Sequence, residues 1–370
     1  MTSKLTTPIS KPGEKLSFVK AKLKNFELLE TIDIQPSENT FPDFPPAITK
    51  PIKCSVYSKP EKLTNEGSLK NSYKFSVKIP NDNSLTYKTG EALGIYVKND
   101  EKVVNYLLER LSLNMLGEKI NDPDKVYEIF CSAGGGLPNY IPKYASIRTL
   151  LTEHIELRWP ALPKMLITSC IDTTKNEEHK LRLKEFASKQ YSRTEYMEHY
   201  LKNRLQICDF LKAFDTTVVS VSQIINFLPR LKYRWYSACS KSGSEVLEFA
   251  FTEARNQSES FSKFGLCTNY LLNLKENDDI YLVQRTSTGF TVPENVSLPI
   301  IMVATGTGLA PFLGFLEDRN SSVDSKTDSK TGRNYLYFGC RHPDLDYIYK
   351  EKLEKYENLR YFFNKLGSVV

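Results

Sequence analysis

The chain has 370 residues, of which 40% are hydrophobic and 25% charged, and its formal net charge at pH 7 is +6. A chain of this length is expected to form about two domains with substantial hydrophobic cores. Its 17 glycines and 19 prolines are too few for a collagen-like or wholly disordered protein. The basic residues are scattered and only slightly in excess, so the composition does not indicate a nucleic-acid partner.

Membrane, export, disulfide and metal signals are missing from the sequence pattern. The strongest apolar run, Leu298 to Ala304, is far shorter than the ~20 residues of a membrane helix. Residues 1–17 lack the apolar core of a signal peptide. The seven cysteines form no C-x-x-C pair, and the four histidines do not cluster with them. We therefore predict a cytoplasmic, reduced protein without a membrane segment, a disulfide scaffold or a metal site.

Residues 1–48 are predicted to form a linker or hinge. Six prolines interrupt this segment, and its charges follow no helical period. Both a floppy extension and a hinge to another domain are compatible with that pattern.

Residues 49–297 are predicted to form an antiparallel barrel that is interrupted by helices. Alternating apolar and polar residues indicate half-buried strands before residue 97 and again from residue 233. Between them, over about 101–222, the apolar residues mostly follow a helical period. Within this insertion Ser192 and Glu195 are predicted to form a capping box, and Ser222 to cap a short helix.

Residues 298–370 are predicted to begin a doubly wound parallel sheet. Ile300 to Ala304 is a continuous apolar run typical of a strand buried on both faces. Further strand patterns follow at Tyr335–Gly339 and Arg360–Phe363, and a helical pattern separates each strand from the next. Because the sequence ends soon after the third strand, the sheet is expected to be truncated. The predicted fold is multidomain, a β-barrel with a helical insertion followed by an α/β domain.

A phosphate-binding turn is predicted at residues 305–311, where Thr-Gly-Thr-Gly-Leu-Ala-Pro follows a buried strand and opens a helix. Glycines let the backbone approach a pyrophosphate, and free N–H groups at a helix start favour the anion. An ordinary strand-to-helix turn would also explain the pattern, but the strand before it and the helix after it favour phosphate.

Two further segments suit a ligand that carries both phosphate and an aromatic ring. Arg234–Ser237, with the sequence Arg-Trp-Tyr-Ser, offers a guanidinium, ring faces and a hydroxyl. Gly265–Thr268, with the sequence Gly-Leu-Cys-Thr, is a glycine turn that opens a helix. Taken alone, the segment Arg234–Ser237 is more typical of an ordinary half-buried strand than of a binding site. Cys267 is more typical of a small packed residue than of a nucleophile.

The order of these motifs resembles the ferredoxin-reductase-like half of the diflavin reductases. R-x-Y-S is followed by G-x-C-T, then by T-G-T-G-x-A-P-F, then by F-G-C-R-H-x-x-x-D-Y. Ser146–Leu151 is similar to the family's motif at the start of its connecting helices. The resemblance covers about residues 50–363 and implies an FAD-binding barrel with a connecting insertion over 49–297, then an NADP-binding domain over 298–370.

The resemblance also implies FAD-binding roles. Arg234 would hold the FAD diphosphate, and Tyr236 would pack on the isoalloxazine ring. The hydroxyl of Ser237, the implied catalytic residue, would approach flavin N5. The segment Gly265–Thr268 would bind the diphosphate from its other side.

For the second cofactor, NADPH, the resemblance implies that Thr307 meets its phosphates. Arg341 and Lys70 would face its adenosine end, and hydride would pass from NADPH to FAD. In full, the cofactor-binding residues that the resemblance implies are Arg234, Trp235, Tyr236, Ser237, Gly265, Leu266, Cys267, Thr268, Thr307, Lys70 and Arg341.

Within the family, two sequence motifs are most similar to those of the methionine synthase reductase branch, namely Gly265–Thr268 and Gly339–His342. That branch implies methionine synthase, with its bound cobalamin, as the partner, reached through FMN in a flavodoxin-like domain or protein. The NADPH–cytochrome reductase of the monooxygenase system is one alternative, and a non-catalytic FAD-binding fragment is another. No FMN site is expected in this sequence, and FAD binding is expected to be better preserved than NADPH turnover.

Overall fold

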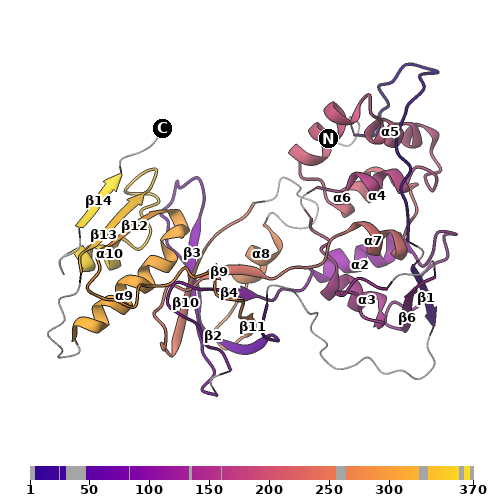
Figure 1. Cartoon of the computed structure of the whole chain (residues 1–370). Coiled ribbons are helices and arrows are strands. Elements are labelled where there is room, and N and C mark those ends of the chain that lie inside the picture. The colour runs from indigo at the N-terminus through magenta and orange to yellow at the C-terminus, as the bar shows by residue number, and fades with distance from the viewer. Residues whose placement is uncertain are drawn as a thin grey trace. The chain divides into compact units, whose positions relative to one another are not determined.

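The structure is a computed structural model of the whole chain (Figure 1). The chain divides into two compact units. Unit one consists of 1–43, 98–232 and 255–266, and unit two of 44–97, 233–254 and 267–370. The residues that the structure describes are 5–24, 26–30, 47–82, 84–132, 136–159, 161–255, 264–324, 332–357 and 362–366.

Six antiparallel strands form a barrel in unit two. Their order is β10-β3-β2-β11-β4-β9, and a bridge between Ala238, just after β9, and Phe249 of β10 joins the two outer strands. Alternation along the strands turns Phe75, Phe249 and Leu282 inward, where they are fully buried. The predicted antiparallel barrel is confirmed. Its strands are β2 (Ile52–Lys62), β3 (Ser72–Lys78), β4 (Ala92–Ile95), β9 (Arg234–Ser237), β10 (Val246–Thr252) and β11 (Asp279–Val283).

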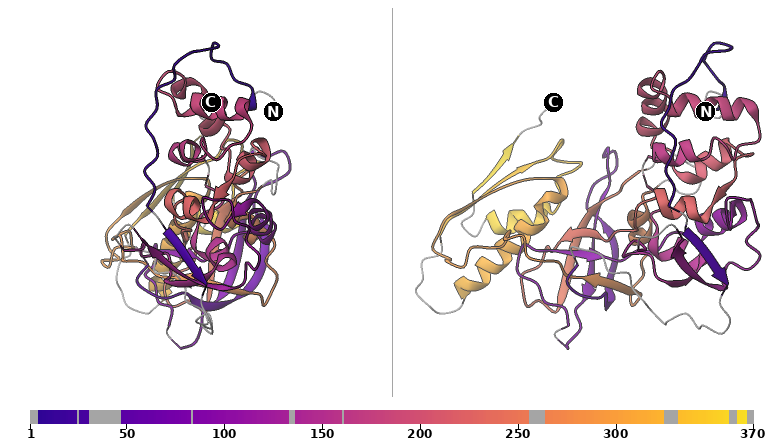
Figure 2. Two further views of the ribbon diagram at one scale, coloured as in Figure 1. Left: turned by 90° about the vertical axis from the view of Figure 1, so that its right-hand side faces the viewer. Right: turned by 45° about the vertical axis from the view of Figure 1, so that its right-hand side comes forward.

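A parallel sheet of order β12-β13-β14 follows the barrel in the same unit. Two helices lie against one face of the sheet (Figure 1 and Figure 2), where Met302 and Leu336 are buried. The opposite face exposes Ile301 and Val303, so the prediction of a strand buried on both faces is wrong for the described part of the chain. The elements are β12 (Ile300–Thr305), α9 (Ala310–Asp324), β13 (Asn334–Gly339), α10 (Lys350–Glu357) and β14 (Phe362–Leu366).

Helix α9 packs directly on the barrel. Gly90 has a left-handed backbone with φ +97°, and a side chain there would collide with the ring of Phe315. Glycine is therefore needed both for the conformation and for the close approach. Beside it, Thr89 donates a hydrogen bond to Asp318 at 2.5 Å and accepts one from the Ser242 N–H at 2.8 Å. These contacts set the spacing between the barrel and the parallel sheet.

Unit one is mostly helical, around a core that includes Leu107, Ile167 and Phe210. The predicted insertion over about 101–222 is therefore largely helical, but it also contains four short strands that the sequence pattern did not indicate. Their alternation is too brief to separate from a helical period. The helices are α2 (Glu101–Arg110), α3 (Ile147–Thr149), α4 (Lys164–Ser169), α5 (Glu177–Ala187), α6 (Ile207–Ala213) and α7 (Val221–Phe227), with π-helical turns η1 (Leu150–His154) and η2 (Ser192–Lys202). The strands are β1 (Phe26–Glu30), β5 (Leu111–Ser112), β6 (Val126–Cys131), β7 (Tyr144–Ser146) and β8 (Val219–Ser220).

Two predicted helix caps differ from the structure. No side-chain cap is formed at the start of η2, because Glu195 instead pairs with the buried guanidinium of Arg182 at 2.7 Å. A charge-assisted bond of this kind is stronger than a neutral cap. At α7 the cap is Ser220, in a capping box with Gln223, rather than Ser222.

The N-terminal segment differs from the predicted linker over 1–48 in its described part. Strand β1 pairs with β6, and Leu5 is buried. The N–H groups of Ile9 and Ser10 donate to Oε1 of Glu185 in α5 at 2.9 and 2.7 Å. These are specific contacts that a floppy linker would not make. Residues 31–46 lie outside the described residues, and a hinge there stays a prediction.

Candidate cofactor-binding sites

Strand β9 carries the R-x-Y-S motif, and its four residues are half-buried. Because side chains alternate along a strand, Arg234 and Tyr236 share one face and Trp235 lies on the other. The ring of Trp235 lies against Gly94, and the guanidinium of Arg285 sits 5.2 Å from its centroid. A ligand on the Tyr236 face would therefore meet Arg234 and Tyr236 rather than the ring of Trp235.

Tyr236 links β9 to helix α8 (Leu266–Leu272). Its hydroxyl donates to Sγ of Cys267 at 3.3 Å, and its ring packs edge-on against Phe251 with centroids 6.5 Å apart. Burial raises the pKa of the Tyr236 hydroxyl, so it stays protonated as a donor. The structure thus brings Tyr236 of the R-x-Y-S motif against Cys267 of the G-x-C-T motif, although 31 positions separate the two residues.

In the G-x-C-T segment, Leu266, Cys267 and Thr268 are buried, and α8 begins directly after Gly265. Oγ of Thr268 accepts a hydrogen bond from the Ala254 N–H at 3.2 Å, which leaves the hydroxyl proton for another acceptor. A ligand would meet the backbone and the Thr268 hydroxyl here, while Leu266 and Cys267 serve as packed side chains.

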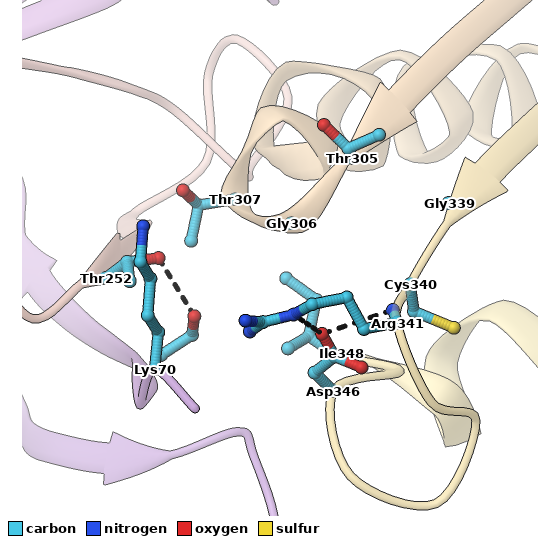
Figure 3. A pocket seen from close by; sticks show the side chains of 11 residues that line it. Lys70, Thr252, Thr305, Gly306, Thr307, Gly339, Cys340, Arg341, Asp346 and Ile348 are labelled. Carbon is cyan, nitrogen blue, oxygen red and sulfur yellow. Dashed lines mark hydrogen bonds and ion pairs between the residues drawn. The ribbon is translucent and has the colours of Figure 1, made fainter. Parts of the chain in front are cut away.

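A cavity of about 600 Å³ lies at the carboxyl ends of β12 and β13 (Figure 3). Lys70 reaches it from the segment between β2 and β3, Thr307 from the turn η3 (Gly306–Leu309), and Arg341 from the loop after β13. Ligands of parallel α/β sheets bind at this end of the strands. The structure thus brings together the three residues that were predicted to meet the nucleotide.

The glycine turn leaves room beside its backbone. Gly306 lines the cavity with a left-handed backbone of φ +51°, and a Cβ added there would meet no atom within 4 Å. Another wall of the cavity carries the hydroxyls of Ser72 and Thr252, which are bonded to each other at 2.9 Å. The turn therefore offers open space beside its backbone to an anion, and phosphate binding there stays a prediction.

Among the described residues, the charged side chains that line the cavity are those of Lys70, Arg341 and Asp346. Nε of Arg341 donates to Oδ2 of Asp346 at 3.0 Å. Burial works against ionisation of Asp346, but hydrogen bonds from the His342 N–H and from Arg341 outweigh it and hold the pKa of this carboxyl below its usual value. Sequence reasoning treated Asp346 only as part of a family motif and missed this contact. The aspartate of F-G-C-R-H-x-x-x-D-Y was the available signal.

Both donor sets fit anionic dinucleotides. The barrel offers a guanidinium, an aromatic ring and hydroxyls, and the cavity offers two cations, hydroxyls and an open glycine turn. Within the described ranges, no group of three or more His, Cys, Asp or Glu could hold a metal ion. In the same ranges, no helix combines the length and the apolarity that crossing a membrane requires.

Comparison with known families agrees with this chemistry. The model described as FAD binding domain matches residues 45–270, and the model described as Oxidoreductase NAD-binding domain matches residues 302–362. Among solved structures, ferredoxin-NADP+ reductase from Plasmodium falciparum aligns with 86% of this chain and 70% of its own, at 16% identity and a TM-score of 0.42. The two family models, rather than this alignment, define the class: a flavoprotein with an FAD-binding domain followed by an oxidoreductase NAD-binding domain.

Curated relatives narrow that class. Human methionine synthase reductase is 28% identical over 378 residues, which is 94% of this chain and 52% of its own length. The NADPH–cytochrome P-450 reductase of Dictyostelium discoideum is 31% identical over 284 residues, 74% of this chain and 39% of its own. The chain thus spans about half the length, or less, of these relatives. It belongs to the FAD binding domain family and corresponds to the FAD- and NADP-binding half of a diflavin reductase.

Proposed function

We propose that the chain is the FAD- and NADPH-binding module of a methionine synthase reductase. FAD, when bound, accepts a hydride from NADPH and releases electrons singly, through FMN of a flavodoxin-like domain or protein, to the oxidised cobalamin of methionine synthase. The observation that carries this proposal is the meeting of Lys70, Thr307 and Arg341 in one cavity, on the same unit as the R-x-Y-S strand.

The barrel residues have distinct roles in this proposal. Arg234 binds the FAD diphosphate, together with backbone N–H groups of Gly265–Thr268 and the free proton of the Thr268 hydroxyl. Tyr236 shares the face of Arg234 and offers its ring to the isoalloxazine. Ser237 is the last residue of β9, and its hydroxyl would reach flavin N5 at this end of the strand rather than from the face of Tyr236. The domain bounds 49–297 and 298–370 and a cytoplasmic location are parts of the same proposal.

Methionine synthase is favoured as the acceptor by two observations. Gly265–Thr268 and Gly339–His342 are most similar to that branch, and methionine synthase reductase aligns with 94% of this chain. The cytochrome reductase alternative is supported by the 31% identity of its relatives over a shorter stretch. To separate them, the chain is mixed with a purified flavodoxin and NADPH, and reactivation of methionine synthase is compared with reduction of a microsomal cytochrome. Turnover with the cytochrome alone would favour the alternative.

Bound flavin is the first property to measure. We expect the purified chain to show a flavin band of about one FAD per chain, as one intact barrel site requires. Arg234→Ala should weaken FAD binding about 10- to 100-fold, because hydrogen bonds to a charged group contribute about 1.5–3 kcal/mol each. The measurement is FAD retained after gel filtration, followed by titration of the apoprotein.

The matched control is Lys53→Ala, which removes another cation of the barrel, one that is exposed and paired with Asp279 at 2.8 Å. It should retain FAD like the unaltered chain. A folded, monodisperse protein without flavin would contradict the barrel assignments. Flavin that NADPH cannot reduce, in the presence of a dye acceptor, would instead support the non-catalytic alternative.

A further inference from the structure

The loop after β13 folds back on itself around one carboxylate. Oδ2 of Asp346 accepts hydrogen bonds from Nε of Arg341 at 3.0 Å and from the Arg341 backbone N–H at 3.3 Å. Oδ1 accepts the His342 N–H at 2.8 Å. The Asp346 side chain is only 15% exposed, whereas that of Arg341 is 48% exposed. The Asp346 carboxylate is therefore held by hydrogen bonds within the loop, whereas about half of the Arg341 side chain is exposed and lines the cavity.

Of the guanidinium nitrogens of Arg341, these bonds engage Nε and leave the two terminal nitrogens to meet a ligand. Nε of Arg341 is engaged by Asp346, while the two terminal nitrogens extend into the cavity towards the side of Lys70 (Figure 3). An arginine side chain carries about 2 kcal/mol of rotamer entropy, and much of it would be lost when a ligand orders it. A partner that already holds Nε reduces that loss before the ligand arrives.

Charge alone argues against an aspartate at this position. The cavity collects two cations, Lys70 and Arg341, as expected for a phosphate-bearing ligand, and Asp346 lines the same cavity. A nearby carboxylate repels such a ligand, so its electrostatic contribution to binding is unfavourable. Positioning of Arg341 is the contribution that opposes this cost.

We propose that Asp346 is a positioning residue, which fixes Arg341 so that its terminal nitrogens bind a phosphate group of the nucleotide in the cavity. The proposal rests on the proposed function, since it takes the ligand to be a nicotinamide dinucleotide. It gives Asp346 no direct contact with the ligand. Its effect on binding is exerted entirely through Arg341.

An electrostatic effect of Asp346 and a positioning effect predict opposite changes in NADP+ affinity for Asp346→Asn in the FAD-loaded full chain. If Asp346 acts through its charge, the variant binds NADP+ more tightly. If it positions Arg341, NADP+ binding weakens about three- to tenfold, the effect of ordering one rotamer-rich side chain on binding. The measurement is calorimetric titration with NADP+. Asp344→Asn, an exposed carboxylate of the same loop, is the matched control and should bind NADP+ at least as tightly as the unaltered chain.

A double-mutant cycle with Arg341→Ala separates positioning from general support of the loop. We expect Asp346→Asn to have no further weakening effect once Arg341 is absent. Asp346→Glu keeps a carboxylate and should bind NADP+ within about threefold of the unaltered chain, which gives a second test if the asparagine variant does not fold. FAD content reports folding in every case.

Tighter or unchanged NADP+ binding by Asp346→Asn would overturn the positioning role, and so would equal weakening in the Arg341→Ala background. Either result would leave the proposed function intact. No NADP+ binding by the unaltered, FAD-loaded chain would overturn both the proposed function and this inference.

Discussion

Replacing Glu185 by alanine is expected to lower the free energy of unfolding of unit one by about 3 kcal/mol, as for a buried ion pair that loses one partner. Glu185 is fully buried, and its Oε2 accepts a hydrogen bond from Arg182 at 2.8 Å. Its Oε1 binds the N–H groups of Ile9 and Ser10. The substitution leaves Arg182 buried with Glu195 as its remaining carboxylate and releases the N-terminal segment from α5.

The chain offers a local reporter for this experiment. Of its two tryptophans, Trp159 lies in unit one and Trp235 in unit two. In a Trp235→Phe background, urea unfolding followed by Trp159 fluorescence therefore reports unit one. Glu177→Ala on the same helix removes an 80% exposed carboxylate that pairs with Lys180, and it should change stability little. Equal stability of the two variants would contradict the prediction, because it would show that the ion pair of Glu185 with Arg182 and its hydrogen bonds to the N-terminal segment add no net stability.

The same carboxylate should make unit one sensitive to acid. Burial alone would raise the pKa of Glu185, but the hydrogen bonds from Ser10 and Arg182 outweigh it and hold the pKa below its usual value. A carboxyl whose pKa is lowered in the folded chain stabilises the fold at pH values above its pKa in the unfolded chain, which is about 4.3 for glutamate. This stabilisation is lost as the pH falls through the pKa of the folded state. The stability difference between the unaltered chain and Glu185→Ala should therefore shrink below about pH 4.

The parts of the fold that the sequence predicted well are those that local patterns determine. The strand-to-helix turn at Gly306 needs only a strand, glycines and a helix in succession, and the structure contains all three. The alternating strands β3 and β10 were likewise visible in the sequence. The family resemblance assigned Lys70, Thr307 and Arg341 to one nucleotide, and the structure has them in one cavity.

The parts that the sequence did not predict depend on side chains that meet over long separations. Glu185 binds residues that lie 175 and 176 positions away, so the N-terminal segment was expected to be a linker. The hydrogen bond from Tyr236 to Cys267 requires β9 and α8 to be placed side by side. The contact of Asp346 with Arg341 spans only five positions, but it depends on a loop conformation that no periodic pattern specifies.

Replacing Ser237 by alanine is expected to slow the reduction of bound FAD by NADPH about 100-fold, the effect of losing one preorganised donor at a reacting centre. The backbone at this position is held on both sides. Ser237 pairs with Ala92 of β4, and the next residue, Ala238, donates its N–H to the Glu91 carbonyl at 3.0 Å and bridges to Phe249. A hydroxyl on such a fixed backbone needs little reorganisation during hydride transfer, so its loss should affect the rate rather than binding.

Stopped-flow absorbance of the FAD-loaded chain measures this rate, and titration with NADP+ measures binding separately. Ser242→Ala, an exposed serine that follows β9, is the matched control and should reduce FAD at the rate of the unaltered chain. If Ser237→Ala loses FAD or weakens NADP+ binding in proportion to the rate, the residue contributes to cofactor binding rather than to hydride transfer. If both serine variants reduce FAD at the unaltered rate, the hydroxyl of Ser237 has no catalytic role, and the rate must depend on how Tyr236 and the nucleotide cavity orient the two cofactors.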